Sequence, residues 1–262
     1  MPYLTVIYTK TDHIACVTLN RPKADNIINR QLGLELIDVC AEINLDKEIL
    51  AVVITGAGNK AFCGGSELEQ LVQAGNTLEA SLAKSGGVVP VASALAAIEF
   101  PVIAAVNGKA SGQGLELALT ADLRLASPKA QFGFPQVALG LIPMDGGTQR
   151  LSRLVGKAKA LELILTAQSI NATEALEIGL VNKVVPQEKL KAEAEALAQT
   201  IATRAPIATR YVKEAVNKGL DLTLEQGLRL EADLYFLLHT TSDRTEGIRA
   251  FLEKRPPRFK GQ

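Results

Sequence analysis

Residues 104–150 read AAVNGKASGQGLELALTADLRLASPKAQFGFPQVALGLIPMDGGTQR, and this segment decides the fold. The apolar run Pro101–Val106, which leads into it, has the length of a buried strand. A glycine turn at residues 112–114 then opens a helix-like stretch, Leu115–Ala121, whose first turns hold one acid, Glu116. Because N–H groups at a helix N-terminus attract anionic oxygens and a carboxylate can act as a general base, the segment predicts a catalytic site. The alternative is that these glycines serve packing alone.

A second glycine turn precedes this segment. Residues 61–67 read AFCGGSE and lead into a helix-like stretch, Leu68–Ala74. Two glycines before a helix again allow backbone N–H groups to face a ligand. The sequence therefore predicts two ligand-facing turns, followed by a polar, glycine-containing loop at residues 76–87.

Composition narrows the class of protein. The chain has 262 residues, 47% of them apolar, which is enough for a sizeable core in one domain or two. Lysine plus arginine equal aspartate plus glutamate at 28 each, so the charge balance predicts no nucleic-acid partner and no anionic membrane. The most apolar tract, Val88–Gly108, is interrupted by Pro90, Glu99 and Pro101 and is too broken to span a bilayer.

The cysteines Cys16, Cys40 and Cys63 are odd in number and lack CxxC spacing. This pattern argues against a metal centre or a disulfide framework and favours a reducing compartment. The N-terminal residues also lack the basic segment, apolar core and cleavage site of a signal peptide. We therefore expect a cytoplasmic protein without a bound metal.

Local patterns predict strands and helices in the first part of the chain. Residues 3–8 and 14–19 are rich in β-branched residues and read as a hairpin. Asn29 is placed to cap a helix over Arg30–Ile43, and Leu50–Thr55 has the composition of a buried strand. These patterns predict strand–strand–helix units.

The second part of the chain predicts helices. Lys157–Thr166 is amphipathic, and residues 171–174 read NATE, which resembles a capping box that opens another helix. From Pro186 onward helix formers dominate, with helices expected at residues 187–202, 207–218, 223–238 and 242–253. The predicted fold is therefore an α/β core of repeated β-β-α units over residues 1–185 and a helical C-terminal region over residues 186–262.

Several ordered motifs resemble the crotonase (enoyl-CoA hydratase/isomerase) superfamily. AAVNGxAxGxGxELAL is followed at family spacing by AxFGxPxVxLGLIPxxGGTQRLxRLVG. The likeness extends to LTVIYTKTDHIACVTLNRPKADNIIN, VVITGAGNKAFCGGSELEQL and EGIRAFLEKRPPRFKG. The resemblance implies a spiral of β-β-α turns whose C-terminal helices assemble a homotrimer or a dimer of trimers, a hexamer. It also implies an acyl-CoA thioester substrate and no further cofactor.

The resemblance assigns roles to both glycine turns. Crotonases hold the thioester oxygen with two backbone N–H groups and so stabilise an enolate; here these groups belong to Ser66 and Gln113. Most relatives have glycine in place of Gln113, but a backbone N–H does not require glycine. Loss of one such donor typically costs on the order of a hundredfold in rate.

Three positions match the family's catalytic segments. Glu116 matches the first catalytic glutamate of the hydratases, which positions or activates water. Gln136 stands where hydratases usually carry the second glutamate, and an amide cannot give or take a proton at ordinary pH. Asp145 lies where other branches place a catalytic aspartate, so it is a candidate replacement proton carrier. The alternative is that Asp145 only forms an Asp-Gly turn.

Other residues match positions that contact the CoA thioester in relatives. They are Lys23, Ala61, Gly64, Gly65, Ser66, Glu67, Leu68, Gly112, Phe251 and Lys254. The resemblance implies that Lys23 and Lys254 meet CoA phosphates and that Phe251 covers the adenine from a neighbouring subunit. Solvated lysines and a packed phenylalanine are the alternative for these three.

The expected activity is hydration or dehydration of a 2-enoyl-CoA or a dienoyl relative, as used in fatty acid metabolism. Double-bond isomerisation is the first alternative, because it needs one base and tolerates Gln136. The second alternative is a non-catalytic acyl-CoA-binding homologue. Gln136 favours that homologue slightly, whereas Glu116 and the two glycine turns count against it.

Overall fold

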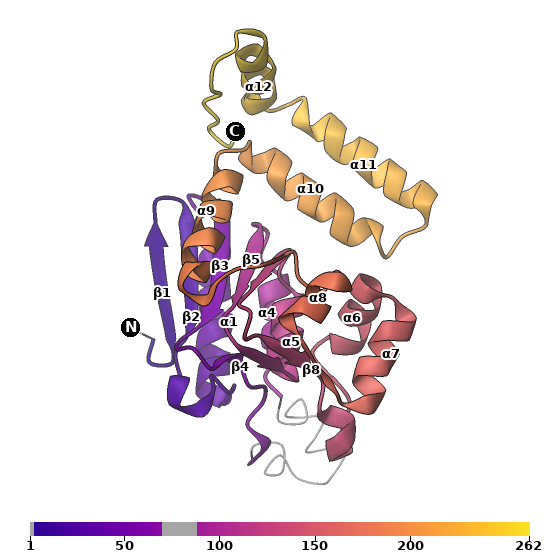
Figure 1. Ribbon diagram of the computed structural model, residues 1–262. Helices are drawn as coiled ribbons and strands as arrows, with labels where there is room; N and C mark the ends of the chain where they lie inside the picture. Colours follow the sequence, from indigo (N-terminus) through magenta and orange to yellow (C-terminus); the bar gives the residue numbers. More distant parts are fainter. Residues whose placement is uncertain (1–2, 70–87) are drawn as a thin grey trace.

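Two β-sheets organise the part of the chain that the structure, a computed structural model, describes: residues 3–69 and 88–262 (Figure 1). The larger sheet has the strand order β1-β2-β3-β5-β7-β10. Its strands are, in that order, Val6–Thr11, Ile14–Leu19, Ala51–Gly56, Val102–Val106, Leu123–Ala126 and Lys183–Val184. β1 is antiparallel to β2, and the other neighbours pair in parallel. The predicted hairpin and the two predicted buried strands are confirmed.

The smaller sheet consists of three-residue strands in the order β4-β6-β8-β9. These are Ala61–Cys63, Lys109–Ser111, Gln131–Gly133 and Ser169–Asn171. β4, β6 and β8 are parallel, with Cys63 opposite Ala110 and Ser111 opposite Gly133, and β9 is antiparallel to β8. Because parallel strands end at the same edge, this sheet brings the segments after β4, β6 and β8 together.

Seven helices lie in the described part of the core; those starting at Arg30, Lys157 and Ala172 begin where the sequence predicts, and those starting at Val91 and Gly147 have no predicted counterpart. The seven are α1 (Arg30–Leu45), α4 (Val91–Ala96), α5 (Gln113–Leu119), α6 (Gly147–Val155), α7 (Lys157–Thr166), α8 (Ala172–Glu177) and α9 (Leu190–Ala202). The Asn29 side chain accepts a hydrogen bond from Leu32 N at 2.9 Å, and Asn171 and Glu174 form the predicted capping box. Both caps satisfy N–H groups that a helix leaves unpaired at its start. The predicted loop at 76–87 and most of the predicted helix at 68–74 lie outside the described residues.

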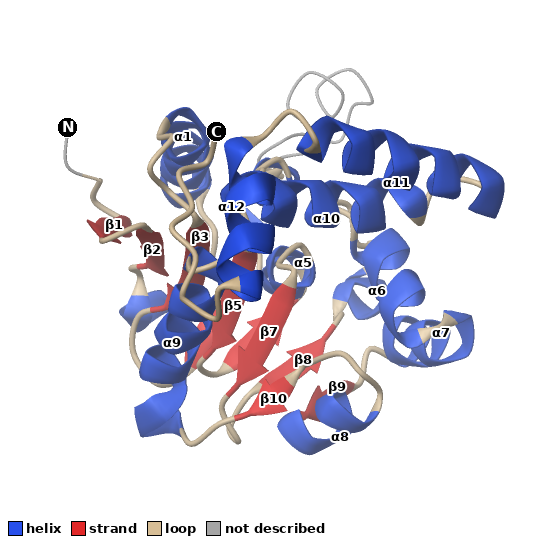
Figure 2. Ribbon diagram, turned by 90° about the horizontal axis from the view of Figure 1, so that it is seen from above, coloured by secondary structure: helices blue, strands red, loops and turns tan. Residues whose placement is uncertain are grey.

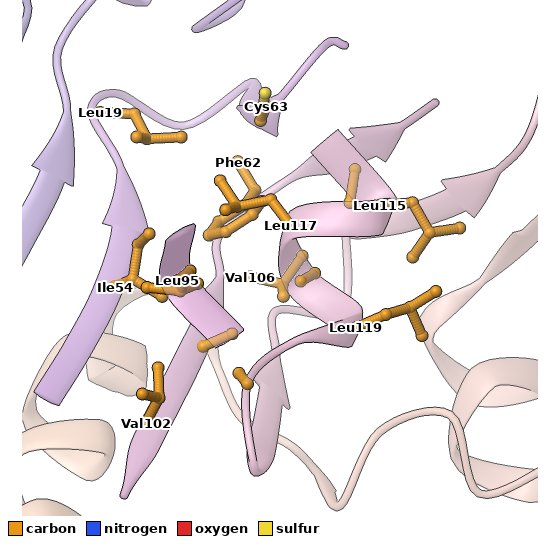
Figure 3. Close-up of a cluster of buried hydrophobic side chains, with 14 of the residues drawn as sticks. Leu19, Ile54, Phe62, Cys63, Leu95, Val102, Val106, Leu115, Leu117 and Leu119 are labelled. Carbon is orange, nitrogen blue, oxygen red and sulfur yellow. The ribbon is translucent and has the colours of Figure 1, made fainter. Parts of the chain in front are cut away.

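The large sheet is buried on both faces, which explains the continuous apolar runs of its central strands. Figure 2 shows α9 on one face and α1 and α5 on the other. On the α5 face, Leu117 packs in the same buried cluster as Leu95 and Ile54 (Figure 3). On the α9 face, Ala194 belongs to a second cluster with Val53. This double cover buries the large sheet, and the smaller sheet carries the two glycine turns, after β4 and β6.

A helical arm follows the core. Figure 1 shows α10 (Pro206–Gly219) and α11 (Leu224–Leu238) side by side, with α12 (Ser242–Leu252) at the end of the arm. The four helices predicted after residue 186 are thus present. α9 follows the predicted domain boundary at residue 186 but packs on the large sheet, so it shares a buried cluster with the core. The boundary therefore stays a prediction. Within residues 3–69 and 88–262, the helices are all too short or too polar to cross a membrane.

Candidate active site

The first glycine turn follows β4 and is anchored by a neighbouring loop. Ile28 N donates to Gly65 O at 2.7 Å, and Glu67 N donates to Ile28 O at 3.0 Å. Ser66 lies between these two bonds, and its own N–H donates to no other described residue. Gly65 has φ of +108°, and a Cβ there would lie 2.9 Å from Ser111 O. Only glycine therefore allows the turn to approach β6 and leave the Ser66 N–H open.

The second glycine turn follows β6 and starts α5. Gly112 has φ of +53°, and its N–H donates to Gly133 O at 3.0 Å. Gln113 is the first residue of α5, so its N–H has no acceptor one turn earlier in the helix. The two turns touch, because Ser66 Oγ donates to Gln113 Oε1 at 2.7 Å. The two residues predicted to form an oxyanion hole are thus neighbours.

Glu116 lies in the first turn of α5 and is only 2% exposed. Its Oε1 accepts hydrogen bonds from Asp145 N and from Gly147 N, both at 2.8 Å. Burial raises the pKa of Glu116 to about 7, and the Asp145 carboxylate also raises the pKa, whereas the two backbone N–H groups and Arg150 lower it. A carboxyl with this pKa exchanges a proton readily near neutral pH.

This pKa predicts a pH-dependent effect of Glu116 on stability. An acid whose pKa rises from 4.5 to about 7 on folding favours the folded state below pH 4.5, and that contribution is lost as the pH rises through 7. Glu116→Gln, which stays neutral, should therefore raise the free energy of unfolding at about pH 8 by up to about 3 kcal/mol, and by much less at about pH 5. Urea unfolding at one protein concentration measures this; an equal change at both pH values would contradict it.

Gln136 lies beside the second turn, at the start of the 3-10 helix η3 (Gln136–Leu139). A Cβ on Gly112 would lie 3.2 Å from Gln136 Nε2, so the carboxamide packs against this glycine. Gln136 Oε1 is buried and has no hydrogen-bond partner among the described residues. Buried acceptors are nearly always satisfied, so this atom points to a ligand or water as its partner.

Asp145 is buried, with 4% exposure, in the bend before α6. Its carboxylate faces the first turn of α4, where it accepts hydrogen bonds from Ala92 N at 2.7 Å and from Ser93 Oγ at 3.0 Å. It also accepts from Gln113 Nε2 at 3.1 Å. The structure therefore brings Asp145 to Glu116 and Gln113, and the carboxylate of Asp145 is occupied by donors from Gln113 and from the first turn of α4.

The remaining predicted contacts fall into two groups. Around the first turn lie Ala61, Gly64, Gly65, Glu67, Leu68 and, on the flanking 3-10 helix η1 (Pro22–Ala24), the exposed Lys23. Glu67 is ion-paired with Arg21 at 3.3 Å. Phe251, 83% exposed, and Lys254 lie at the end of the arm, away from β4 and α5 (Figure 1). Within one chain, these two residues do not reach the turns.

Two buried asparagines that sequence reasoning missed support the entry to β4. Asn26 Nδ2 and Asn107 Nδ2 both donate to Ala61 O, at 2.9 and 3.2 Å. Asn107 Oδ1 also accepts from Gly56 N at 3.1 Å. A polar residue directly after the buried strand β5 is the signal that could have identified Asn107, whereas Asn26 has no local signal.

Comparison with known proteins identifies the family and the fold of the chain. A family model described as Enoyl-CoA hydratase/isomerase matches residues 9–262. The short-chain-enoyl-CoA hydratase of Clostridium acetobutylicum is 44% identical over 252 residues, covering 95% of each chain. The crotonyl-CoA hydratase of Syntrophomonas wolfei is 42% identical over 261 residues, covering 99% of each. The crystal structure of enoyl-CoA hydratase from Bacillus anthracis has a TM-score of 0.93 at 39% identity, covering 99% of this chain and 100% of that one.

Proposed function

The chain belongs to the enoyl-CoA hydratase/isomerase family, and from this premise we propose that it is an enoyl-CoA hydratase acting on a 2-enoyl-CoA. The observation that carries the proposal is the meeting of two glycine turns beside a buried glutamate. Ser66 and Gln113 supply two open N–H groups, and Glu116 supplies a carboxyl with a pKa of about 7. Such a site suits a reaction that creates an oxyanion while a proton moves.

The oxyanion hole acts on the thioester carbonyl. The N–H groups of Ser66 and Gln113 donate hydrogen bonds to its oxygen. These hydrogen bonds become stronger as negative charge builds up on the oxygen in the enolate. Because both donors belong to the main chain and are held by β4, β6 and α5, they need little reorganisation during the reaction. The N-terminus of α5 is also the positive end of the helix dipole, which favours the negative charge on the enolate oxygen.

Glu116 handles both proton transfers in this proposal. As a carboxylate, it takes a proton from water while the water oxygen bonds to C3 of the enoyl group and the π electrons move into the thioester enolate. The resulting carboxylic acid then gives that proton to C2, which restores the carboxylate and the thioester carbonyl. Water is thus added across the double bond with no second acid, in keeping with glutamine at position 136.

Gln136 orients the water in this scheme. Its carboxamide packs beside Gly112 and carries a buried oxygen without a partner among the described residues. That oxygen can accept one hydrogen bond from the water, while Glu116 accepts the other. The amide therefore keeps the geometry of the family's second acid without its proton.

A substrate screen tests the activity. The purified protein is incubated with crotonyl-CoA and with a 3-enoyl-CoA, and products are followed by thioester absorbance and proton NMR. Hydration predicts 3-hydroxybutyryl-CoA from crotonyl-CoA. Turnover of the 3-enoyl-CoA alone would instead indicate the one-base isomerase that Gln136 also permits. Binding of both thioesters without turnover would indicate a non-catalytic homologue.

We also propose that the arm assembles a homotrimer or a dimer of trimers, in which Phe251 and Lys254 reach the CoA of a neighbouring subunit. The arm exposes large apolar side chains that a monomer would leave in water. They include Val212, Val216, Leu224, Leu228, Tyr235, Phe236, Phe251 and Leu252. Self-association covers such a surface.

Phe236→Asp should therefore break the oligomer. Phe236 lies on α11 and is 67% exposed, and a carboxylate there would be buried unpaired in an apolar interface. Light scattering should show a threefold or larger mass for the wild type at micromolar concentration and a monomer for the variant. Glu231→Ala, an exposed charge on the same helix, is the matched control. A monomeric wild type would contradict the assembly.

We propose that the protein needs no cofactor beyond the CoA carried by its thioester substrate and that it works in the cytoplasm. Among residues 3–69 and 88–262, His, Cys, Asp and Glu form no group of three or more that could hold a metal ion. Cys16, Cys40 and Cys63 are all unpaired. Dialysis against a chelator should accordingly leave the hydration rate unchanged.

A further inference from the structure

The side chain of Gln113 is buried away from the predicted thioester site. It is 3% exposed, and Gln113 is the first residue of α5, where the main-chain N–H has no acceptor one turn earlier in the helix. Its Oε1 accepts from Ser66 Oγ at 2.7 Å, and its Nε2 donates to Val89 O at 2.6 Å and to Asp145 Oδ2 at 3.1 Å. The carboxamide thus joins the residue of the first turn to the bend before α6.

Asp145 extends this connection in two directions. Its carboxylate accepts from Gln113 Nε2 and from the first turn of α4, through Ala92 N, Ser93 N and Ser93 Oγ at 2.7 to 3.2 Å. Its own main-chain N–H donates to Glu116 Oε1 at 2.8 Å. Asp145 is therefore fixed by its side chain and holds the predicted base by its backbone.

We propose that Gln113 and Asp145 are positioning residues that lock both halves of the oxyanion hole and the base Glu116 into one unit. The inference rests on the proposed function, because it assigns Ser66 N, Gln113 N and Glu116 to the reaction. The unbroken path of hydrogen bonds runs from Ser66 through Gln113 and Asp145 to Glu116. We call these four residues the brace.

The brace matters because its members come from separate segments. Ser66 follows β4, Gln113 and Glu116 start α5, and Asp145 precedes α6. Glycine turns alone would let the first turn and the bend move relative to α5. Hydrogen bonds between buried groups resist that movement, because breaking one leaves a buried donor or acceptor unpaired. The distance from the hole to the base is then held before substrate arrives, which favours the transition state.

The same contacts argue against the expected role of Asp145 as a proton carrier. Both carboxylate oxygens accept hydrogen bonds from groups that stay in place, namely the start of α4 and Gln113. A proton carrier needs an oxygen that can reach the substrate. Asp145 therefore serves geometry, and Glu116 carries the proton.

Side-chain replacements that keep shape test the brace. Gln113→Met keeps length but no hydrogen bonds, and Ser66→Ala removes the hydroxyl; both keep the main-chain N–H. We expect kcat for crotonyl-CoA to fall about tenfold or more in each, with little change in KM. Because both changes break one unit, the double variant should fall little further than Gln113→Met. Ser152→Ala removes a comparable half-buried hydroxyl on α6 and is the control.

The affinity for two CoA thioesters tests the brace without requiring turnover. The enolate of acetoacetyl-CoA places negative charge on the thioester oxygen, whereas butyryl-CoA presents a neutral carbonyl. Calorimetry should show that Gln113→Met weakens acetoacetyl-CoA binding by about tenfold more than butyryl-CoA binding. A merely structural side chain would lower the melting temperature and leave both the affinity ratio and kcat unchanged, which would overturn the proposal.

Asp145→Asn separates positioning from proton transfer. Its amide presents a donor where Asp145 accepts, so the brace is disturbed and kcat should fall about tenfold to a hundredfold, with the affinity ratio altered as in Gln113→Met. Abolished turnover with an unaltered ratio would overturn the proposal and make Asp145 the proton carrier. If the wild type shows no turnover, the proposed hydratase function fails. The brace is then judged by binding alone, and it is rejected if Gln113→Met leaves the ratio of acetoacetyl-CoA to butyryl-CoA affinity unaltered.

Discussion

Glu116→Gln is expected to lower kcat for hydration of crotonyl-CoA by about a thousandfold, with KM nearly unchanged. A general acid–base residue typically contributes a hundredfold to ten-thousandfold, and in the proposed mechanism one residue performs both proton transfers. The amide oxygen still accepts from Asp145 N and Gly147 N, so α5 and the bend before α6 keep their places. Stopped-flow measurement of the loss of enoyl absorbance gives both constants.

The pH profile supplies an independent check on Glu116. Because the carboxylate form takes the proton from water, kcat/KM should fall about tenfold per pH unit below the Glu116 pKa of about 7 and level off above it. Residual turnover of Glu116→Gln should lack this dependence. Glu174→Gln, which keeps the capping box of α8, is a matched control and should behave as wild type. Wild-type turnover by Glu116→Gln would make Glu116 an ordinary buried acid.

Much of the fold follows from local sequence. The caps at Asn29 and Asn171 start α1 and α8 because their side chains satisfy helical N–H groups nearby in the chain. The β1–β2 hairpin follows from two β-branched runs around a turn. The three-residue strands of the small sheet escape such reasoning, because a period of two cannot be recognised in three residues. Their pairing depends on contacts between distant segments.

The candidate site also has a part that local sequence predicts and a part that depends on distant segments. Ser66, Gln113 and Glu116 follow glycine turns, whose backbone freedom is visible in the sequence. The contacts of the Asp145 carboxylate could not be predicted, because its partners on α4 lie more than fifty positions away. The direction of the Gln113 side chain depends on its own distant partners, Ser66, Val89 and Asp145. Motifs thus identify which residues meet, whereas buried hydrogen bonds between distant segments fix how each side chain is held.

Gly114→Ala should damage activity and stability together, because this glycine sets the distance between α5 and β4. A Cβ on residue 114 would lie 2.7 Å from the carbonyl carbon of Cys63 and 2.8 Å from its Cβ, well inside the usual carbon–carbon contact of about 3.5–4.0 Å. The start of α5 would have to move by roughly an ångström, and it carries both Gln113 N and Glu116. A displacement of that size can cost about a hundredfold in rate, so we expect at least that loss in kcat and a lower melting temperature.

Gly219→Ala provides the matched control for this change. Gly219 ends α10, and a Cβ there would meet no atom within 4 Å. Alanine is favoured over glycine in helices by up to about 1 kcal/mol, so this variant should be as stable as wild type or slightly more stable, with unchanged kcat. The contrast isolates the close approach of α5 to β4 from the general effect of replacing glycine. A Gly114→Ala enzyme with wild-type kcat and melting temperature would show that α5 tolerates the shift, and that the hole and the base need no fixed spacing.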